Sequence, residues 1–103
     1  LFRSSAASDV YKRQYNISMN KWYVYIVECA DGSLYTGITT DVKRRLLEHN
    51  YSFKSAKYTR SRRPVRLVWS KEVADRSEAS KEEYRIKRLK RKQKMELIQE
   101  GSP

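Results

Sequence analysis

The first apolar stretch of the chain has the composition of paired β-strands. Residues 22–28 (WYVYIVE) are dense in β-branched and aromatic side chains, and residues 34–38 (LYTGI) repeat that composition. Residues 31–33 between them read Asp-Gly-Ser, which supplies the chemistry of a tight turn. This pattern predicts a β-hairpin over residues 22–38.

The apolar spacing then changes from that of a strand to that of a helix. Val42 and Leu46 stand one helical turn apart and share a face, while Lys and Glu residues lie largely elsewhere. Thr40 or Asp41 can cap the free amides of the first turn. We therefore expect a helix from Val42 to about Asn50.

The rest of the chain predicts one more strand and one more helical region. Residues 51–64 mix Ser, Lys and Arg without a regular period, which indicates a basic loop with a short helical turn. Residues 65–70 (VRLVWS) resume the alternation of a strand. Helical spacing then returns from Ser77, a candidate N-cap, to about Gln99, in one segment or two.

The order of elements, β-β-α-loop-β-α-α, is typical of a small α+β domain with a three-stranded antiparallel sheet flanked by helices. We predict one such domain over residues 19–103. Residues 1–18 show no sustained period, and their stretch SSAASDVYKRQ resembles a translated sequencing adapter. We expect these residues to be a disordered or artefactual N-terminal extension, with Met19 as the natural start.

The charge of the chain narrows its partners. It has 23 Lys and Arg against 12 Asp and Glu, a net charge of +11, which attracts polyanions over long distances. Nucleic acid is the leading partner, although a solvated basic surface, a ribosomal protein or a membrane-surface protein would also be basic. Cys29 is the single cysteine, so the chain forms no internal disulfide and no cysteine zinc site, which fits the cytoplasm. No apolar stretch approaches the roughly 20 residues of a membrane span, so we expect no membrane partner.

Two tyrosines on the predicted hairpin are the first candidates for chemistry. Tyr25 and Tyr35 lie on consecutive strands, where a suitable register would bring their hydroxyl groups close together. The chain has eight tyrosines, so ordinary strand aromatics are the simpler explanation for this pair alone.

Three other polar residues have a spacing that favours a site. Arg45 and His49 share one face of the first predicted helix, which places a cation beside a titratable imidazole. Glu83 falls near Ala79 and Ile86 around a later helix, at the border of its apolar stripe. Taken singly, each has an ordinary explanation: a solvated arginine, a partly buried histidine, or a carboxylate in an ion pair.

Together these residues resemble a known family. Residues 23–25 (YVY) and 35–37 (YTG) are similar to the two halves of the GIY-YIG signature, and Gly37 matches the glycine of the second half. Arg45 and His49 match the arginine of the first helix and the His or Tyr one turn later. The run from Lys57 to Val68 resembles the small stand-alone bacterial YhbQ/YazA-like branch.

The later helix carries the remaining part of the resemblance. In the family a metal-binding Glu follows an alanine by four residues and often precedes a basic residue by one turn. Ala79, Glu83 and Lys87 match this pattern. Tyr23 and Val24 replace the Gly-Ile of the signature, Thr36 replaces its second Ile, and Ile38 stands where some relatives carry Lys.

The resemblance implies a GIY-YIG-like fold and a metal-dependent endonuclease. Glu83 would hold one Mg²⁺ or Mn²⁺, and Arg45 would bind the scissile phosphate. Tyr25 or Tyr35 would accept a proton from the attacking water, with its pKa lowered from about 10 by the neighbouring cations. His49 would orient a tyrosine hydroxyl or relay a proton.

The expected substrate is nucleic acid, and family analogy favours DNA in repair or recombination. A protein partner that supplies substrate specificity is also expected. The alternatives are a catalytically weak or silent DNA- or RNA-binding module on the same fold, and an RNA- or ribosome-associated structural protein. The residues expected to bind nucleic acid are Gly37, Lys54, Lys57, Tyr58, Arg60, Arg62, Arg63 and Lys87.

Overall fold

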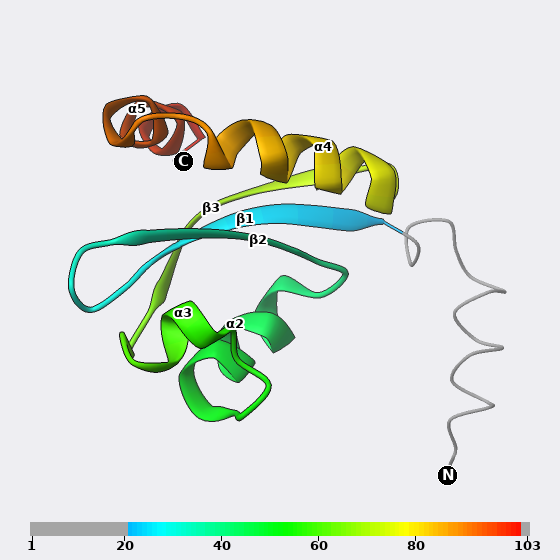
Figure 1. The fold of residues 1–103 in the computed structure, drawn as a ribbon. Helices are drawn as coiled ribbons and strands as arrows, with labels where there is room; N and C mark the ends of the chain where they lie inside the picture. Colours follow the sequence, from blue (N-terminus) through cyan, green and yellow to red (C-terminus); the bar gives the residue numbers. More distant parts are fainter. Residues whose placement is uncertain (1–20, 102–103) are drawn as a thin grey trace, which may run out of the picture.

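The computed structural model describes residues 21–101, and the predicted extension over residues 1–18 lies outside this range. Seven elements follow one another along the described chain (Figure 1). They are β1 (Trp22–Glu28), β2 (Leu34–Thr39), α2 (Val42–Tyr51), α3 (Lys57–Arg60), β3 (Arg66–Val73), α4 (Arg76–Lys87) and α5 (Arg91–Gly101).

The strands form one antiparallel sheet in the order β2-β1-β3. Figure 1 shows α4 and α5 on one side of this sheet, with α2 and α3 on the other. The predicted α+β architecture, with its three-stranded antiparallel sheet flanked by helices, is therefore confirmed. Because helices lie on both faces of the sheet, the side chains of the central strand β1 are covered on both sides and reach the two layers of helices alternately.

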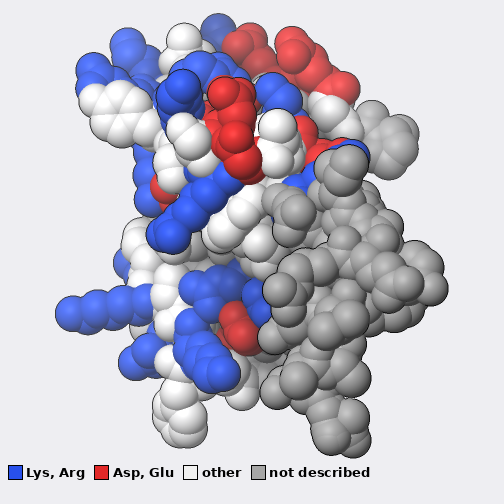
Figure 2. Space-filling view, turned by 90° about the vertical axis from the view of Figure 1, so that its right-hand side faces the viewer, with Lys and Arg blue, Asp and Glu red and all other residues white. Residues whose placement is uncertain are grey.

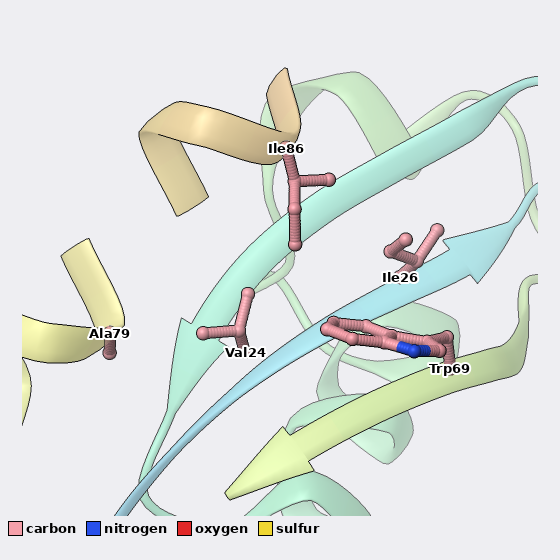
Figure 3. Packing of buried hydrophobic residues seen from close by; sticks show 5 residues of the cluster. All are labelled: Val24, Ile26, Trp69, Ala79 and Ile86. Atoms are coloured by element: carbon pink, nitrogen blue, oxygen red, sulfur yellow. The ribbon is translucent and has the colours of Figure 1, made fainter. Parts of the chain in front are cut away.

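The side chains of β1 divide the interior into two clusters. Val24 and Ile26 pack with Trp69, Ala79 and Ile86 under α4 and α5 (Figure 3). We call this the apolar layer.

The alternate residues of β1 belong to the other layer. Tyr25 and Val27 pack with Cys29 and Val65, and Tyr35 and Leu46 border them. This layer lies against α2 and α3, and we call it the tyrosine layer.

Local chemistry explains where the helices begin. Asp41 caps α2 by accepting the amide of Arg44, as one of the two predicted caps. The predicted cap Ser77 is wrong, since α4 begins at Arg76 and Asp75 accepts the amide of Glu78. A carboxylate both fills the free amide and suits the positive end of the helix dipole, which favours the earlier start.

The later elements refine the sequence prediction. The third strand reaches Val73 rather than Ser70, because β1 pairs with it as far as Trp22↔Val73. The last helical region is two segments, α4 and α5, and the predicted turn in the basic loop is α3. Among residues 21–101, none of the helices is both long enough and apolar enough to cross a membrane.

Candidate active site

Tyr25 lies directly over Gly37 in the tyrosine layer. The two residues face each other across the β1–β2 ladder, and Tyr25 is only 2% exposed. A Cβ atom on residue 37 would lie 2.5 Å from the Tyr25 hydroxyl oxygen and 2.7 Å from Cζ. Glycine is needed here because only its bare Cα leaves space for the phenol ring.

A chain of buried hydrogen bonds leads from Tyr25 to α3. Its hydroxyl oxygen lies 2.7 Å from Nε2 of His49, and Nδ1 of His49 lies 2.8 Å from Oγ1 of Thr59. The Thr59 hydroxyl donates to the carbonyl of Ala56 at 3.0 Å. His49 and Thr59 are both fully buried.

This chain selects one tautomer of His49. A hydroxyl has a single proton, so Thr59 donates to Ala56 and accepts from Nδ1–H of His49. Nε2 then accepts a hydrogen bond from the Tyr25 hydroxyl. The opposite tautomer would leave the buried Tyr25 proton without an acceptor in the described part of the chain, which is unfavourable. Of the two lone pairs of the Tyr25 oxygen, one faces the Arg45 guanidinium, which donates to it, and the other remains available as an acceptor.

Burial controls the protonation of the Tyr25–His49 pair. It raises the pKa of Tyr25 to about 12, although the Arg45 guanidinium acts in the opposite direction. Burial also lowers the pKa of His49 to about 4, and the charge of Arg45 adds to this. Both groups are thus neutral near pH 7. The expected fall in the tyrosine pKa is wrong for Tyr25, because loss of water around the phenol outweighs the nearby cation.

Arg45 is held at the edge of the same layer. Its guanidinium donates to Glu48 at 2.9 Å and to the carbonyl of Lys54 at 2.7 Å, and its side chain is 22% exposed. The helix places Arg45 one turn before His49, as the sequence spacing predicts. An anchored and partly exposed guanidinium is well placed to bind an anion from solvent.

Glu83 approaches the site from the opposite layer. Its carboxylate lies 3.3 Å from Nζ of Lys87, with 25% of its side chain exposed, and it is close enough to contribute to the raised pKa of Tyr25. Lys87 Nζ in turn lies 5.9 Å from the centre of the Tyr35 ring. The Glu83–Lys87 pair thus extends from α4 toward Tyr35 on the edge strand β2.

The donor set near Glu83 bears on the expected metal. No group of three or more His, Cys, Asp or Glu side chains with metal-binding geometry occurs within residues 21–101. Mg²⁺ commonly uses one or two carboxylates and fills its other positions with water and substrate phosphate. The partly exposed carboxylate of Glu83 fits this mode of binding.

Comparison with known proteins gives this arrangement a family. The family model described as the GIY-YIG catalytic domain matches residues 21–96. This chain belongs to the GIY-YIG family. It is also 62% identical to the UPF0213 protein of Desulfotalea psychrophila over 77 residues, which cover 75% of this chain and 70% of that protein. A UPF0213 protein of Staphylococcus epidermidis is 54% identical over 83 residues, covering 81% of this chain and all of the relative.

Solved structures agree with the fold. The solution structure of a UPF0213 protein from Bacillus halodurans is 50% identical, with a TM-score of 0.52, and the match covers 81% of this chain and 88% of that one. A protein structure from E. faecalis is 43% identical, with a TM-score of 0.54 and coverage of 77% and 83%. The resemblance to the small bacterial branch of the GIY-YIG family is thereby confirmed.

In this GIY-YIG chain, the second signature tyrosine takes part in a stack of rings. Tyr35 meets His49 edge-on at 5.5 Å between ring centres and stacks on Tyr58 at 5.8 Å. The guanidinium of Arg62 lies 4.0 Å above the centre of the Tyr58 ring. Tyr35 and Arg62 both contact the Tyr58 ring, which is still 39% exposed. The expected binding of nucleic acid by Tyr58 stays a prediction.

The basic residues expected to bind nucleic acid differ in whether their charged groups are exposed to solvent or hydrogen-bonded within the protein. Arg63 points inward and donates to the carbonyls of His49 and Ser52 and to the hydroxyl of Ser55. Through these hydrogen bonds Arg63 holds the connection between α2 and α3 in place, so its guanidinium has a structural role. Lys54 and Lys57 are exposed. The surface in Figure 2 shows Lys and Arg in both its upper and lower parts, while Asp and Glu gather mainly toward the top.

Sequence reasoning missed two residues of this GIY-YIG site. Thr59 orients His49, and Glu48 holds Arg45. Glu48 stands three residues after Arg45, a spacing that allows an ion pair on a helix and could have indicated it. The sequence offers no comparable signal for Thr59, because its hydroxyl meets His49 through the packing of α3 on α2.

Proposed function

We propose that this chain is a divalent-metal-dependent endonuclease that hydrolyses phosphodiester bonds in nucleic acid, with DNA as the substrate. One observation supports this most strongly. The Tyr25 hydroxyl is fixed against Gly37 and His49, and Arg45 and Glu83 both influence the same phenol. A group that orients water, a phosphate-binding cation and a metal-binding carboxylate are among the groups that phosphodiester hydrolysis needs. The proposed domain is residues 19–103.

Glu83 would hold the metal, which would supply charge stabilisation and a more acidic water. The chain itself positions the reacting groups. Nε2 of His49 accepts a hydrogen bond from the Tyr25 hydroxyl, so the lone pairs of the phenol oxygen point away from His49. That oxygen is then able to accept a hydrogen bond from a water molecule and orient it.

The two signature tyrosines have different tasks in this proposal. Tyr25 is 2% exposed and its pKa is about 12, so it orients rather than ionises near pH 7. Tyr35 is half-buried at the edge strand, in contact with the rings of His49 and Tyr58. Its greater access to solvent favours Tyr35 as the group that meets the attacking water. Tyr35 would first release its hydroxyl proton to solvent and would then, as the phenolate, take the proton of that water.

Arg45 binds the scissile phosphate in this proposal. Its planar group of donors suits two phosphate oxygens, and contact with Glu48 and the Lys54 carbonyl already limits its motion. Because the charge on the phosphate grows during hydrolysis, the guanidinium stabilises the transition state more than the bound substrate.

The basic surface supplies affinity without reading a sequence. Exposed lysines such as Lys54 and Lys57 neutralise phosphates, so binding weakens as salt rises. A role in DNA repair or recombination, a cytoplasmic location and a protein partner that directs the enzyme to its substrate belong to the same proposal.

One observation favours a second function, a nucleic-acid-binding module without nuclease activity. Both candidate catalytic charges are already paired, Arg45 with Glu48 and Glu83 with Lys87. Such pairs would have to open or rearrange before phosphate and metal could bind.

A cleavage assay separates the two functions. The full chain is incubated with labelled single-stranded, duplex and branched DNA and with RNA, in Mg²⁺, Mn²⁺ or EDTA. We expect metal-dependent products that Glu83→Gln abolishes, while Glu78→Gln, a change on the exposed face of the same helix, retains them. Binding without cutting in every metal would reject the nuclease and select the binding module.

A further inference from the structure

The connection between α2 and α3 presents two aromatic rings to solvent. Phe53 is 94% exposed, and Tyr51, the last residue of α2, is 81% exposed. Covering large apolar side chains that protrude this far removes apolar surface from water, which is favourable. Such side chains commonly mark a binding surface. The aromatic loop, residues 51–55, is therefore a candidate contact.

Arginine side chains hold the backbone of the aromatic loop by hydrogen bonds to its carbonyl groups. Arg60 donates to the carbonyls of Phe53 and Ser55 at 3.0 and 3.3 Å, and Arg45 donates to the carbonyl of Lys54 at 2.7 Å. Arg63 donates to the carbonyl of Ser52. These bonds hold the backbone while the Phe53 ring stays outside, so little order remains to be gained when a partner binds.

The charge around the loop indicates what that partner is. Residues 51–63 carry five cations and no carboxylate, and two carboxylates from other segments lie beside them, Asp31 at Arg62 and Glu48 near Lys54. A polyanion is attracted to such a surface, whereas an apolar protein partner gains nothing from these charges. Nucleic acid combines the required phosphate charge with flat bases that stack on aromatic rings.

We propose that Phe53, assisted by Tyr51, is a stacking site for unpaired bases, so that the substrate of this chain contains a single-stranded segment. The proposal rests on the proposed function, because it names the substrate class of the same site. Bases inside a duplex are already stacked on one another and expose no face to Phe53. Unpaired bases expose their faces and gain the contact with any sequence.

The position of the loop relates the bound base to the reaction. The guanidinium of Arg45, proposed to bind the scissile phosphate, contacts the carbonyl of the residue next to Phe53. A base on Phe53 therefore belongs to a nucleotide close to the cut. Strands with an unpaired region at the cut, such as flaps, forks or gaps, meet this requirement.

The test measures affinity without cleavage. The full chain, in EDTA and at one fixed salt concentration, is titrated against labelled single-stranded DNA, single-stranded RNA and duplex DNA of equal length. We expect Phe53→Ala to weaken single-strand binding by roughly 5- to 100-fold, as loss of a stacked ring does, and to leave duplex binding nearly unchanged. Tyr51→Ala should give a smaller loss of the same kind.

Matched variants show whether stacking is the cause. Phe53→Trp should retain the affinity, and Phe53→Leu, which keeps an apolar side chain without a flat ring, should lose it. Tyr84→Ala removes another exposed aromatic ring, 64% exposed on α4, and should have no effect.

Three outcomes overturn the proposal: no change for Phe53→Ala, an equal loss for duplex, or full retention by Phe53→Leu. Equal losses on DNA and RNA support stacking in general, and a loss on one of them names the substrate. Since no cutting is measured, a chain that binds as expected but never cleaves removes the nuclease proposal and keeps Phe53 as the stacking site of a binding module.

Discussion

The two faces of the β-sheet bury different kinds of side chain. On the side of α4 and α5, the buried cluster holds apolar side chains such as Val24, Ile26 and Ile86. On the side of α2 and α3, His49 and Thr59 are fully buried as well, but each carries a polar group that must find a partner. The apolar layer gains stability from every contact, whereas the tyrosine layer depends on a particular set of hydrogen bonds.

This difference shows why the candidate chemistry lies on one side of the sheet. An apolar cluster tolerates many arrangements of similar volume. A buried phenol, imidazole and hydroxyl tolerate few, because an unpaired member costs the free energy of removing it from water. The tyrosine layer therefore contributes less to the stability of the fold than the apolar layer, but it holds its groups in one orientation.

The largest effect on stability should come from the apolar layer. Ile86→Ala removes a fully buried side chain and should lower the free energy of unfolding by about 2–5 kcal/mol, measured by urea denaturation. Ile86→Val should cost about 0.5–1.5 kcal/mol. Both variants should keep the wild-type pH dependence, since Ile86 touches no titratable member of the tyrosine layer; a changed pH dependence would show that the two layers are coupled.

A drop in pH should act on the tyrosine layer instead. The folded pKa of His49 is about 4 and the ordinary value is about 6.5, so the unfolded chain binds the proton more tightly. The stabilisation is therefore complete above pH 6.5 and is lost as the pH falls toward 4. Between pH 7 and pH 5 the expected loss is about 2 kcal/mol.

Urea denaturation at several pH values measures this loss. The chain has one histidine, so His49→Gln removes this contribution by a single change. The variant is expected to be less stable at pH 7 but to show a much flatter profile between pH 7 and pH 5. Parallel profiles for the two proteins would contradict the buried, neutral state of His49.

The smallest effect should follow the loss of one hydroxyl group. Thr59→Val keeps the shape of the side chain but removes the acceptor for Nδ1–H of His49, at a cost of about 1 kcal/mol in unfolding free energy. Nitrogen NMR of the single histidine should show the proton on Nδ1 in the wild type and a shift toward the Nε2–H tautomer in Thr59→Val.

Thr59→Ser is the control for that experiment, since it retains a hydroxyl. It should preserve the Nδ1–H tautomer. An Nε2–H tautomer in the wild type would disprove the direction assigned to the Tyr25–His49–Thr59 chain. If Thr59→Val left the tautomer unchanged, some other acceptor would hold the ring.

Much of the fold follows from local patterns. The hairpin, the helix from Val42 and the helical region after residue 76 were predictable because apolar spacing and turn residues agree there. Ser77 was the wrong cap because Asp75 competes for the same role with a charged side chain. The length of β3 depends on its pairing with β1, which no pattern within the strand records.

The candidate site divides in the same way. Tyr25, Tyr35, Arg45, His49 and Glu83 were selected from sequence. The structure groups the first four in the tyrosine layer, with Glu83 close enough for its charge to act on Tyr25. The pKa of Tyr25 was expected to fall and instead rises to about 12, because the extent of its burial depends on residues far away in the chain. Their roles in catalysis remain proposals.

The sequence by itself determined the order of the elements, the family and the residue types available for chemistry, because these depend on spacing along the chain. Only the tertiary structure decided which way the protons of Tyr25 and His49 point, and that Arg63 braces a loop while Phe53 stands free. Hydrogen-bond direction and burial depend on groups brought together from distant segments. Thr59 and His49 meet only when α3 packs on α2.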